Sequence, residues 1–371
     1  MKKDIMSPER LASSLAITDL TDPKNGIHAI NLVARNIRQA LEDAYIGTTI
    51  EEVRTNPEVS IKENFDDLLF PNDNPGRSSR YTRYVTPDTI LRTHTSAAIP
   101  GWLKKAAQNG VNDTIVVLPG ITYRRDVVDK IHCGEPHRMD VWRIKRGVPR
   151  FGRADLIHLV ETILNCVVPG YKYRANEMKH PYTINGLEVE VLVNGSWLEV
   201  LECGEAHPTV LKNAGLNPQE YSGLALGMGL DRLVMIIKEI DDIRILRSSD
   251  PRIRRQMTHL DKFVKVSDQP ATKRVLSYST SMDKTEEDVC EEIRDELGQN
   301  AVYIEKIEYI EILYEKLPAK AKENLGIRPN QKNVVVTLTF RSLEGSLQRT
   351  MVNEWMQRLY PRLNEGDRGY M

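Results

Sequence analysis

Residues 114–142, TIVVLPGITYRRDVVDKIHCGEPHRMDVW, are the stretch around which the rest of this chain is interpreted. A β-branched run, a Pro-Gly break, an extended piece ending in YRRD and a final RMDVW predict two strands joined by a polar loop. If residues 121–126 are extended, the two-residue period of a strand places Arg124 and Asp126 on one face. A cation and a carboxylate held in this way can bind an anion and a hydrogen-bond donor together, as a nucleotide requires.

Composition narrows the class of protein. The chain has 371 residues, which is long enough for two domains. Its residues are 40% hydrophobic and 28% charged, a composition that is ordinary for a globular protein. A formal net charge of -1 argues against a protein that binds polyanions over its whole surface, although local basic patches are compatible with this charge. No apolar run approaches the roughly 18 residues of a membrane span, and MKKDIMSPER lacks a signal-peptide core. We therefore expect no membrane partner. The 4 cysteines form no CxxC pair, so we expect reduced thiols and a cytoplasmic location.

The clearest hairpin signal lies at residues 187–203, LEVEVLV-NG-SWLEVLEC. The alternation of LEVEVLV is typical of a half-buried antiparallel strand, and Asn-Gly is a preferred two-residue turn. Strict alternation on the second strand predicts one face made of Trp197, Glu199, Leu201 and Cys203. Because an unpaired carboxylate among apolar side chains is costly, Glu199 requires a cation. The two interpretations are a metal-bound nucleotide and a structural ion pair with an arginine.

Three further segments carry candidate ligand contacts. Residues 223–240, GLALGMGLDRLVMIIKEI, enter a helix through glycines that permit close backbone approach, and Arg232 lies in its first turns. GxGxxR alone is a weak motif, since such glycines often form only a tight turn. The cluster THTS at 93–96 is either a turn that satisfies its own backbone or a strand end that presents donors to a small ligand. The basic stretch 143–153 is either a solvated loop or a phosphate-backbone contact.

The composition shifts near residue 268. Residues 269–371 predict strand, helix, strand, strand and helix in that order, which suggests a ferredoxin-like α+β module. We therefore expect an α+β protein with two domains, 1–268 and 269–371.

Several separated blocks together resemble the class II aminoacyl-tRNA synthetases, specifically the phenylalanyl-tRNA synthetase α-subunit type. The blocks are NPEV with NFDDLLFPNDNPGR, LRTHTS, YRRDVVDKIH followed by a second histidine, WLEVLECGEAHPTVL and GLALGMGLDR. VTLTFRSLEGSLQRTMVNE resembles the ferredoxin-fold anticodon-binding domain that single-chain organellar enzymes carry at their C-terminal end. The resemblance implies an antiparallel sheet flanked by helices for residues 1–268, followed by that second domain.

The resemblance also implies roles for the nucleotide half of a site. Arg124 would bind the α-phosphate of ATP and Arg232 the γ-phosphate. Asp126 would reach the adenine amine, His132 would support the phosphates, and Glu199 would hold Mg²⁺. Fixed cations around a crowded polyanion stabilise the charge that develops during adenylate formation, so no nucleophilic side chain is needed.

The amino-acid half departs from the family. The implied contacts are His94, Ser96, Arg138, Asp140, His180, Tyr182 and Ala225. Of these, Ala225 matches the residue that leaves room for a phenyl ring. Arg138 and Asp140 stand where the family has glutamine and glutamate, and Ile99 stands where it has another glutamine. His180 and Tyr182 replace the paired phenylalanines that sandwich the substrate ring.

Two more changes lie beside this half of the site. Glu202 replaces a glycine and Glu205 an apolar residue. One interpretation is a rebuilt specificity, because buried polar groups discriminate strongly against ligands that leave them unpaired. The other is compensation, with Arg138 paired to Glu202 or Glu205. A zinc site, formed either by His132, Cys133 and His137 or by Cys203 and His207, does not fit familiar ligand spacings.

The resemblance therefore implies an ATP- and Mg²⁺-dependent ligase of protein biosynthesis that activates phenylalanine or an analogue and transfers it to tRNA. It also implies a monomer or homodimer that requires no β-subunit. Two alternatives stand beside it. One is a paralogue that activates a different amino acid or charges a non-tRNA acceptor, and the other is a non-catalytic tRNA-binding or regulatory protein.

Overall fold

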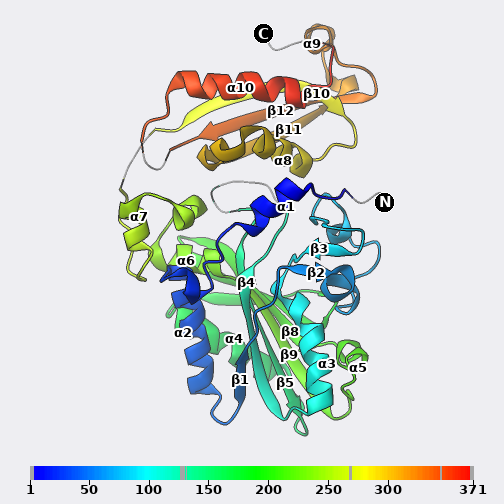
Figure 1. Cartoon of the computed structure of the whole chain (residues 1–371), viewed down its shortest axis with the longest axis vertical. Coiled ribbons are helices and arrows are strands. Elements are labelled where there is room, and N and C mark those ends of the chain that lie inside the picture. The colour runs from blue at the N-terminus through cyan, green and yellow to red at the C-terminus, as the bar shows by residue number, and fades with distance from the viewer. Residues whose placement is uncertain (1–3, 126–129, 131, 267–269, 343–344, 368–371) are drawn as a thin grey trace. The chain divides into compact units, whose positions relative to one another are not determined.

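The computed structural model describes residues 4–125, 130, 132–266, 270–342 and 345–367 (Figure 1). The chain forms two compact units. Unit 1 consists of Met1–Arg124, Glu135–Ile240 and Gln256–Phe263, and unit 2 of Arg125–Gly134, Asp241–Arg255 and Val264–Met371. Unit 2 therefore includes two segments that lie, in sequence, between segments of unit 1.

A seven-stranded sheet forms the centre of unit 1, with the order β1-β4-β5-β9-β8-β7-β6. The strands are β1 (Thr49–Glu52), β4 (Asp113–Ile121), β5 (His137–Arg146), β6 (Tyr173–Glu177), β7 (Thr183–Val193), β8 (Ser196–Ala206) and β9 (Tyr221–Gly229). All neighbours are antiparallel except β1 and β4. A separate hairpin pairs β2 (Glu58–Ser60) with β3 (Thr89–Leu91). The predicted large antiparallel sheet is confirmed.

Helices flank this sheet on both faces. On one face α2 (Ala29–Ala44) packs against α4 (Arg153–Val167) and α6 (Leu230–Lys238). On the other, α3 (Ile99–Asn109) and α5 (Pro208–Asn213) share a core with sheet residues such as Val116 and Trp142. The short α1 (Pro8–Leu15) precedes them in the chain.

The amphipathic helix predicted for residues 27–45 is confirmed as α2. Its stripe is fully buried, with Ile30, Val33, Ile37 and Leu41 each at most 1% exposed. Residues spaced by three and four positions lie on one side of a helix, which is why this stripe faces the core.

The Asn-Gly hairpin is also confirmed. Asn194 and Gly195 have φ angles of 49° and 83°, and Val193 lies opposite Ser196. Two consecutive positive φ angles give a turn whose twist matches that of the flanking strands, which explains why this dipeptide is favoured there. The turn sets the register of β7 against β8.

That register contains an irregularity further along. On β7, Val189 lies opposite Leu201. The next residue, Glu190, lies opposite Glu199, so Val200 has no partner. One extra residue in a strand is a β-bulge, and it shifts the alternation of the side chains beyond it. The two halves of β8 are therefore out of phase with each other.

The predicted face of Glu199 on β8 is consequently wrong. Glu199 shares its face with Trp197 and, across the bulge, with Glu202, while Leu201 and Cys203 point to the opposite face. Simple alternation failed because it assumes an unbroken ladder.

Unit 2 contains a three-stranded antiparallel sheet in the order β10-β12-β11. The strands are β10 (Thr272–Ser281), β11 (Ile304–Leu313) and β12 (Gln331–Phe340). The helices α8 (Glu286–Leu297) and α10 (Arg349–Leu363) bury one sheet face, and their shared core includes Tyr278, Ile293, Val336 and Leu359. The short α9 (Ala319–Leu325) precedes β12, and α7 (Pro251–Gln256) precedes β10.

Candidate functional site

Arg124 lies immediately beyond β4 in unit 1. Its Nε donates to the main-chain oxygen of Thr93 at 2.9 Å, and its own main-chain oxygen accepts from Nη2 of Arg83 at 3.3 Å. Asp126, the predicted neighbour on the same face, lies outside the described residues. His132 belongs to the segment that groups with unit 2.

Arg232 and Glu199 lie side by side in unit 1. Nη1 of Arg232 donates to the main-chain oxygen of Glu199 at 2.7 Å and lies 3.7 Å from its Oε2. The first turn of α6 supplies the arginine and the first half of β8 supplies the carboxylate. The Glu199 side chain is 42% exposed, so the prediction that apolar neighbours enclose it is wrong. Its cation partner in the structure is the arginine.

The face of the sheet around Glu199 is acidic. Burial, and then the carboxylates of Glu199, Glu190 and Glu202, raise the pKa of Glu188. Because carboxylates this close together disfavour each other's ionisation, a cation bound at this face would be stabilised. No group of three or more metal-ligating side chains is found within the described ranges, and a metal held here would need oxygen ligands from its substrate.

Aromatic rings border the predicted amino-acid half of the site. The Tyr182 ring centroid lies 5.9 Å from those of Phe70 and Trp142 and 6.5 Å from that of His94. Burial, followed by the nearby carboxylates of Asp140 and Glu202, raises the pKa of Tyr182. Its hydroxyl is therefore protonated and can donate a hydrogen bond.

His94 is a neutral hydrogen-bond acceptor toward this site. Its Nε2 lies 2.9 Å from the main-chain oxygen of Asn64. Because a carbonyl oxygen can only accept, Nε2 carries the proton and Nδ1 presents a lone pair. Burial above all, with the charge of Arg124 next, lowers the His94 pKa to about 3. Its Nδ1 is buried and has no hydrogen-bond partner among the described residues.

Ser96 and Asp140 are joined as a buried pair. The Ser96 main-chain N–H donates to Oδ2 of Asp140 at 2.6 Å, and Nε1 of Trp142 donates to Oγ of Ser96 at 3.0 Å. Gly227 lies opposite Asp140 on β9, and a side chain there would approach Oδ1 of Asp140 to 2.8 Å. The glycine therefore keeps this part of the sheet surface open. Ala225, also on β9, is 2% exposed.

Glu202 lies beside the imidazole of His180. Their Oε2 and Nε2 atoms lie 3.5 Å apart. The contact with His180 is the main cause that lowers the pKa of Glu202, burial opposes it, and the charge of Arg138 contributes a smaller lowering. The predicted compensation of Glu202 by Arg138 is thus secondary to His180. Glu205 instead accepts from Nδ2 of Asn185 at 2.9 Å, so its predicted pairing with Arg138 is wrong.

Arg138 occupies the start of β5, opposite Gly120 and Gly229. Its Nε is buried and finds no hydrogen-bond partner within the described part of the chain. A buried donor of this kind is costly unless a ligand or water meets it. It marks Arg138 as a side chain prepared for an acceptor.

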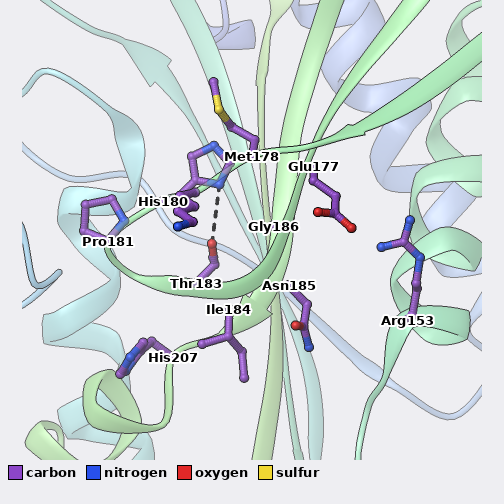
Figure 2. Close-up of a pocket in the computed structure, with 11 residues that line it drawn as sticks. Arg153, Glu177, Met178, His180, Pro181, Thr183, Ile184, Asn185, Gly186 and His207 are labelled. Atoms are coloured by element: carbon purple, nitrogen blue, oxygen red, sulfur yellow. Dashed lines mark hydrogen bonds between the residues drawn. The ribbon is translucent and has the colours of Figure 1, made fainter.

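A pocket of about 790 Å³ opens beside the connection between β6 and β7. Figure 2 shows His180 over Thr183, whose Oγ1 lies 3.4 Å from its Nδ1. The lining includes Arg153, Glu177, His180, Thr183, Asn185 and His207. His180 therefore lines this pocket and also contacts Glu202.

His137 is a structural residue, in contrast to the zinc-ligand alternative. Its Nε2 accepts from the main-chain N–H of Leu20 at 3.2 Å, and its Nδ1 lies 2.9 Å from Oδ1 of Asp231. Both ring nitrogens are occupied. The sequence did not point to Asn64, Asp231 or Arg83, because each acts through contacts with distant parts of the chain.

None of the described helices combines the length and hydropathy needed to cross a bilayer.

Comparisons with known proteins agree on one family. Residues 18–257 match the family model described as tRNA synthetases class II core domain (F). The phenylalanine–tRNA ligase alpha subunit of a Nostoc species is 33% identical over 234 residues, covering 63% of this chain and 68% of that protein. The alpha subunit of Nostoc punctiforme is 34% identical over 248 residues, covering 66% and 72%.

A mitochondrial phenylalanine–tRNA ligase from Dictyostelium discoideum is 33% identical over 239 residues, covering 57% of this chain and 51% of that protein. The chain thus spans about half the length of this mitochondrial relative.

Proposed function

We propose that this chain, which belongs to the class II aminoacyl-tRNA synthetases and is a phenylalanyl-tRNA synthetase-like ligase, activates an amino acid with ATP and transfers it to tRNA. The observation that supports this most directly is the contact between Arg232 and Glu199. A guanidinium and a half-exposed carboxylate side by side suit a triphosphate and its divalent cation.

The nucleotide half of the proposed site uses charge and position. Arg124 would hold the α-phosphate, Arg232 the γ-phosphate and Glu199 the Mg²⁺, with Asp126 and His132 on the adenine and phosphates. Mg²⁺, when bound, neutralises charge on the phosphates and leaving pyrophosphate. The amino-acid carboxylate attacks the α-phosphorus, so the protein supplies orientation and fixed positive charge.

The amino-acid half would use the buried polar groups beneath the aromatic rings. Nδ1 of His94 can only accept, which suits the α-ammonium of an amino acid. Asp140 adds a fixed negative charge held in place by Ser96. Tyr182 borders the same space, and Ala225 provides a small side chain on the sheet surface.

A second candidate function is activation of an amino acid other than phenylalanine. The specific observation in its favour is the polar group around Glu202, which pairs with His180 at 3.5 Å. Together with the unpaired Nε of Arg138, it gives the site hydrogen-bonding capacity that a phenyl ring cannot use. A polar side chain of similar size would satisfy these groups.

We also propose the domain assignment 1–268 and 269–371, with the second domain contacting tRNA. Backbone recognition needs local positive charge, which the near-neutral chain can supply. A monomer or homodimer without a β-subunit, acting in the cytoplasm, completes the proposal. Transfer to a non-tRNA acceptor is the alternative for the second step.

The test is ATP–pyrophosphate exchange with each amino acid offered separately. Exchange with phenylalanine supports the first candidate, and exchange only with a polar amino acid supports the second. Arg124→Ala should abolish exchange, and Glu199→Gln should raise the Mg²⁺ concentration needed for half-maximal rate. Full exchange activity in the Arg124→Ala variant would refute the assignment of Arg124 to the α-phosphate. Absence of exchange with every amino acid would refute adenylation itself.

A further inference from the structure

Arg83 is a buried arginine outside the regular elements of unit 1, 9% exposed. Its Nη2 lies 2.5 Å from Oε1 of Glu135 and donates to the main-chain oxygen of Arg124 at 3.3 Å. Its Nη1 donates to Oγ of Ser14 at 3.5 Å. Its main-chain oxygen accepts from the N–H of Leu91 at 3.0 Å, which anchors the residue beside β3.

Two of the partners of Arg83 lie at related places in the sequence. Arg124 and Glu135 flank residues 125–134, one at each end. The ends are also joined directly, since Thr122 donates to the main-chain oxygen of Pro136 from its N–H at 2.9 Å and from its Oγ1 at 3.2 Å. The guanidinium of Arg83 therefore contacts the chain shortly after β4 ends, at Arg124, and shortly before β5 begins, at Glu135.

We propose that Arg83 is a positioning residue for adenylation, acting by fixing the main chain of Arg124. This inference rests on the proposed role of Arg124 at the α-phosphate. The Arg124 side chain is itself bonded to the oxygen of Thr93, so a shift of its main chain displaces its guanidinium relative to that anchor. A misplacement of about 1 Å at a reacting centre can lower a rate on the order of a hundredfold.

The chemistry of the contact explains why an arginine is suited to this position. A guanidinium offers several donors in a fixed plane, so it can bind a carboxylate and a main-chain oxygen at once. Lysine is a single compact charge that can keep the pair with Glu135 but not the whole set. Methionine fills a similar volume and removes every donor, leaving Glu135 without this partner.

The experiment compares Arg83→Met and Arg83→Lys in the full chain by ATP–pyrophosphate exchange. We expect Arg83→Met to raise the KM for ATP at least tenfold, while the KM for the amino acid changes less than twofold. Arg83→Lys should recover part of the loss. This split separates positioning of the nucleotide from general loss of structure.

Arg143→Met is the matched control. Arg143 is 13% exposed at its side chain and bonds Asp113 through Nε at 2.9 Å and Nη2 at 2.7 Å, so it also loses a half-buried ion pair. We expect a comparable fall in thermal stability and an unchanged KM for ATP. An equal KM increase in both variants would overturn the proposal, since it would reflect destabilisation alone.

The double variant Arg83→Met with Arg124→Ala tests the route of action. ATP binding measured by titration calorimetry should be no weaker than in Arg124→Ala alone, because the effect of Arg83 passes through Arg124. An additive loss would overturn this route. If Arg124→Ala loses exchange while Arg83→Met keeps its KM for ATP, the inference fails and the proposed function stands. If Arg124→Ala keeps exchange, it is the proposed phosphate role that fails.

Discussion

His137 and Asp231 are joined by two contacts, although 94 residues separate them in the chain. The His137 main-chain N–H donates to Oδ2 at 2.5 Å, and its Nδ1 lies 2.9 Å from Oδ1. Both residues are buried, at 0% and 4% exposure. The contact ties the first residue of β5 to the first turn of α6, the helix that presents Arg232.

Removing this carboxylate should destabilise the fold. Asp231→Ala leaves a buried main-chain N–H and an imidazole N–H without their acceptor, and we expect a loss of about 3 kcal/mol in the free energy of unfolding. Asp231→Asn retains one acceptor and should lose about 1 kcal/mol. Guanidinium unfolding monitored by circular dichroism measures both. Equal stability of Asp231→Ala and the parent chain would contradict the importance of the contact.

The buried His94 should make stability depend on pH. Its folded-state pKa is about 3, lowered by burial first, against an ordinary value of 6.5. Between these values the unfolded chain binds a proton that the folded chain does not. The stabilising contribution is therefore complete above about pH 6.5 and is lost as the pH falls toward about 3.

His94→Asn removes this titration. We expect its free energy of unfolding to fall less steeply between pH 7 and pH 4 than that of the parent chain, by a slope equivalent to about one proton. Chemical unfolding at several pH values gives both slopes. Parallel curves would mean that the pKa of His94 is the same in the folded and unfolded chains.

Amino-acid preference should respond to the pair of His180 and Glu202. We expect His180→Phe combined with Glu202→Gly to lower the KM for phenylalanine in pyrophosphate exchange at least tenfold, because an apolar ring then no longer meets polar groups that it cannot bond. Glu205→Gln is the control, since Glu205 bonds Asn185 and not this pair. A double variant with no gain for phenylalanine would place its selection elsewhere.

The uncovered face of the unit 2 sheet should contact tRNA. Lys273 and Lys306 both lie opposite Thr339 on that face, where Val275 and Ile310 are each 60% exposed. Replacing both lysines by alanine should weaken tRNA binding. It should also reduce the slope of log Kd against log salt by about one to two units.

Lys320→Ala with Arg362→Ala removes the same charge from α9 and the exposed surface of α10 and should leave binding unchanged. Filter binding at several salt concentrations compares the two pairs. Equal effects would show that only total charge matters.

Local signals in the sequence were sufficient for much of the fold. The stripe of α2 and the Asn194-Gly195 turn could be predicted because neighbouring residues alone determine them. Arg232 and Glu199 were also identified, but not their contact, because it depends on a helix and a strand being brought together. The structural role of His137 could not be predicted for the same reason, since its partners Leu20 and Asp231 are distant in sequence.

The site was harder to predict where one contact depends on a shift in register. The side-chain alternation of β8 gave the wrong neighbours for Glu199, since nothing local distinguishes Val200 from any other strand valine. Arg83 carries no motif, and its proposed role depends on contacts with the two ends of a segment that is distant in sequence. Such residues become visible when burial and hydrogen-bond partners are known.

The unpaired Val200 also affects how β8 tolerates change. Deleting this one residue would restore an unbroken ladder with β7 and would keep Glu199 and Glu202 on one face, because the two glutamates would then stand two positions apart. The bulge thus gives a spacing of three residues to two glutamates that share a face, where an unbroken strand would place them two residues apart. Deletion of Val200 should therefore leave both charges on their present face of the sheet.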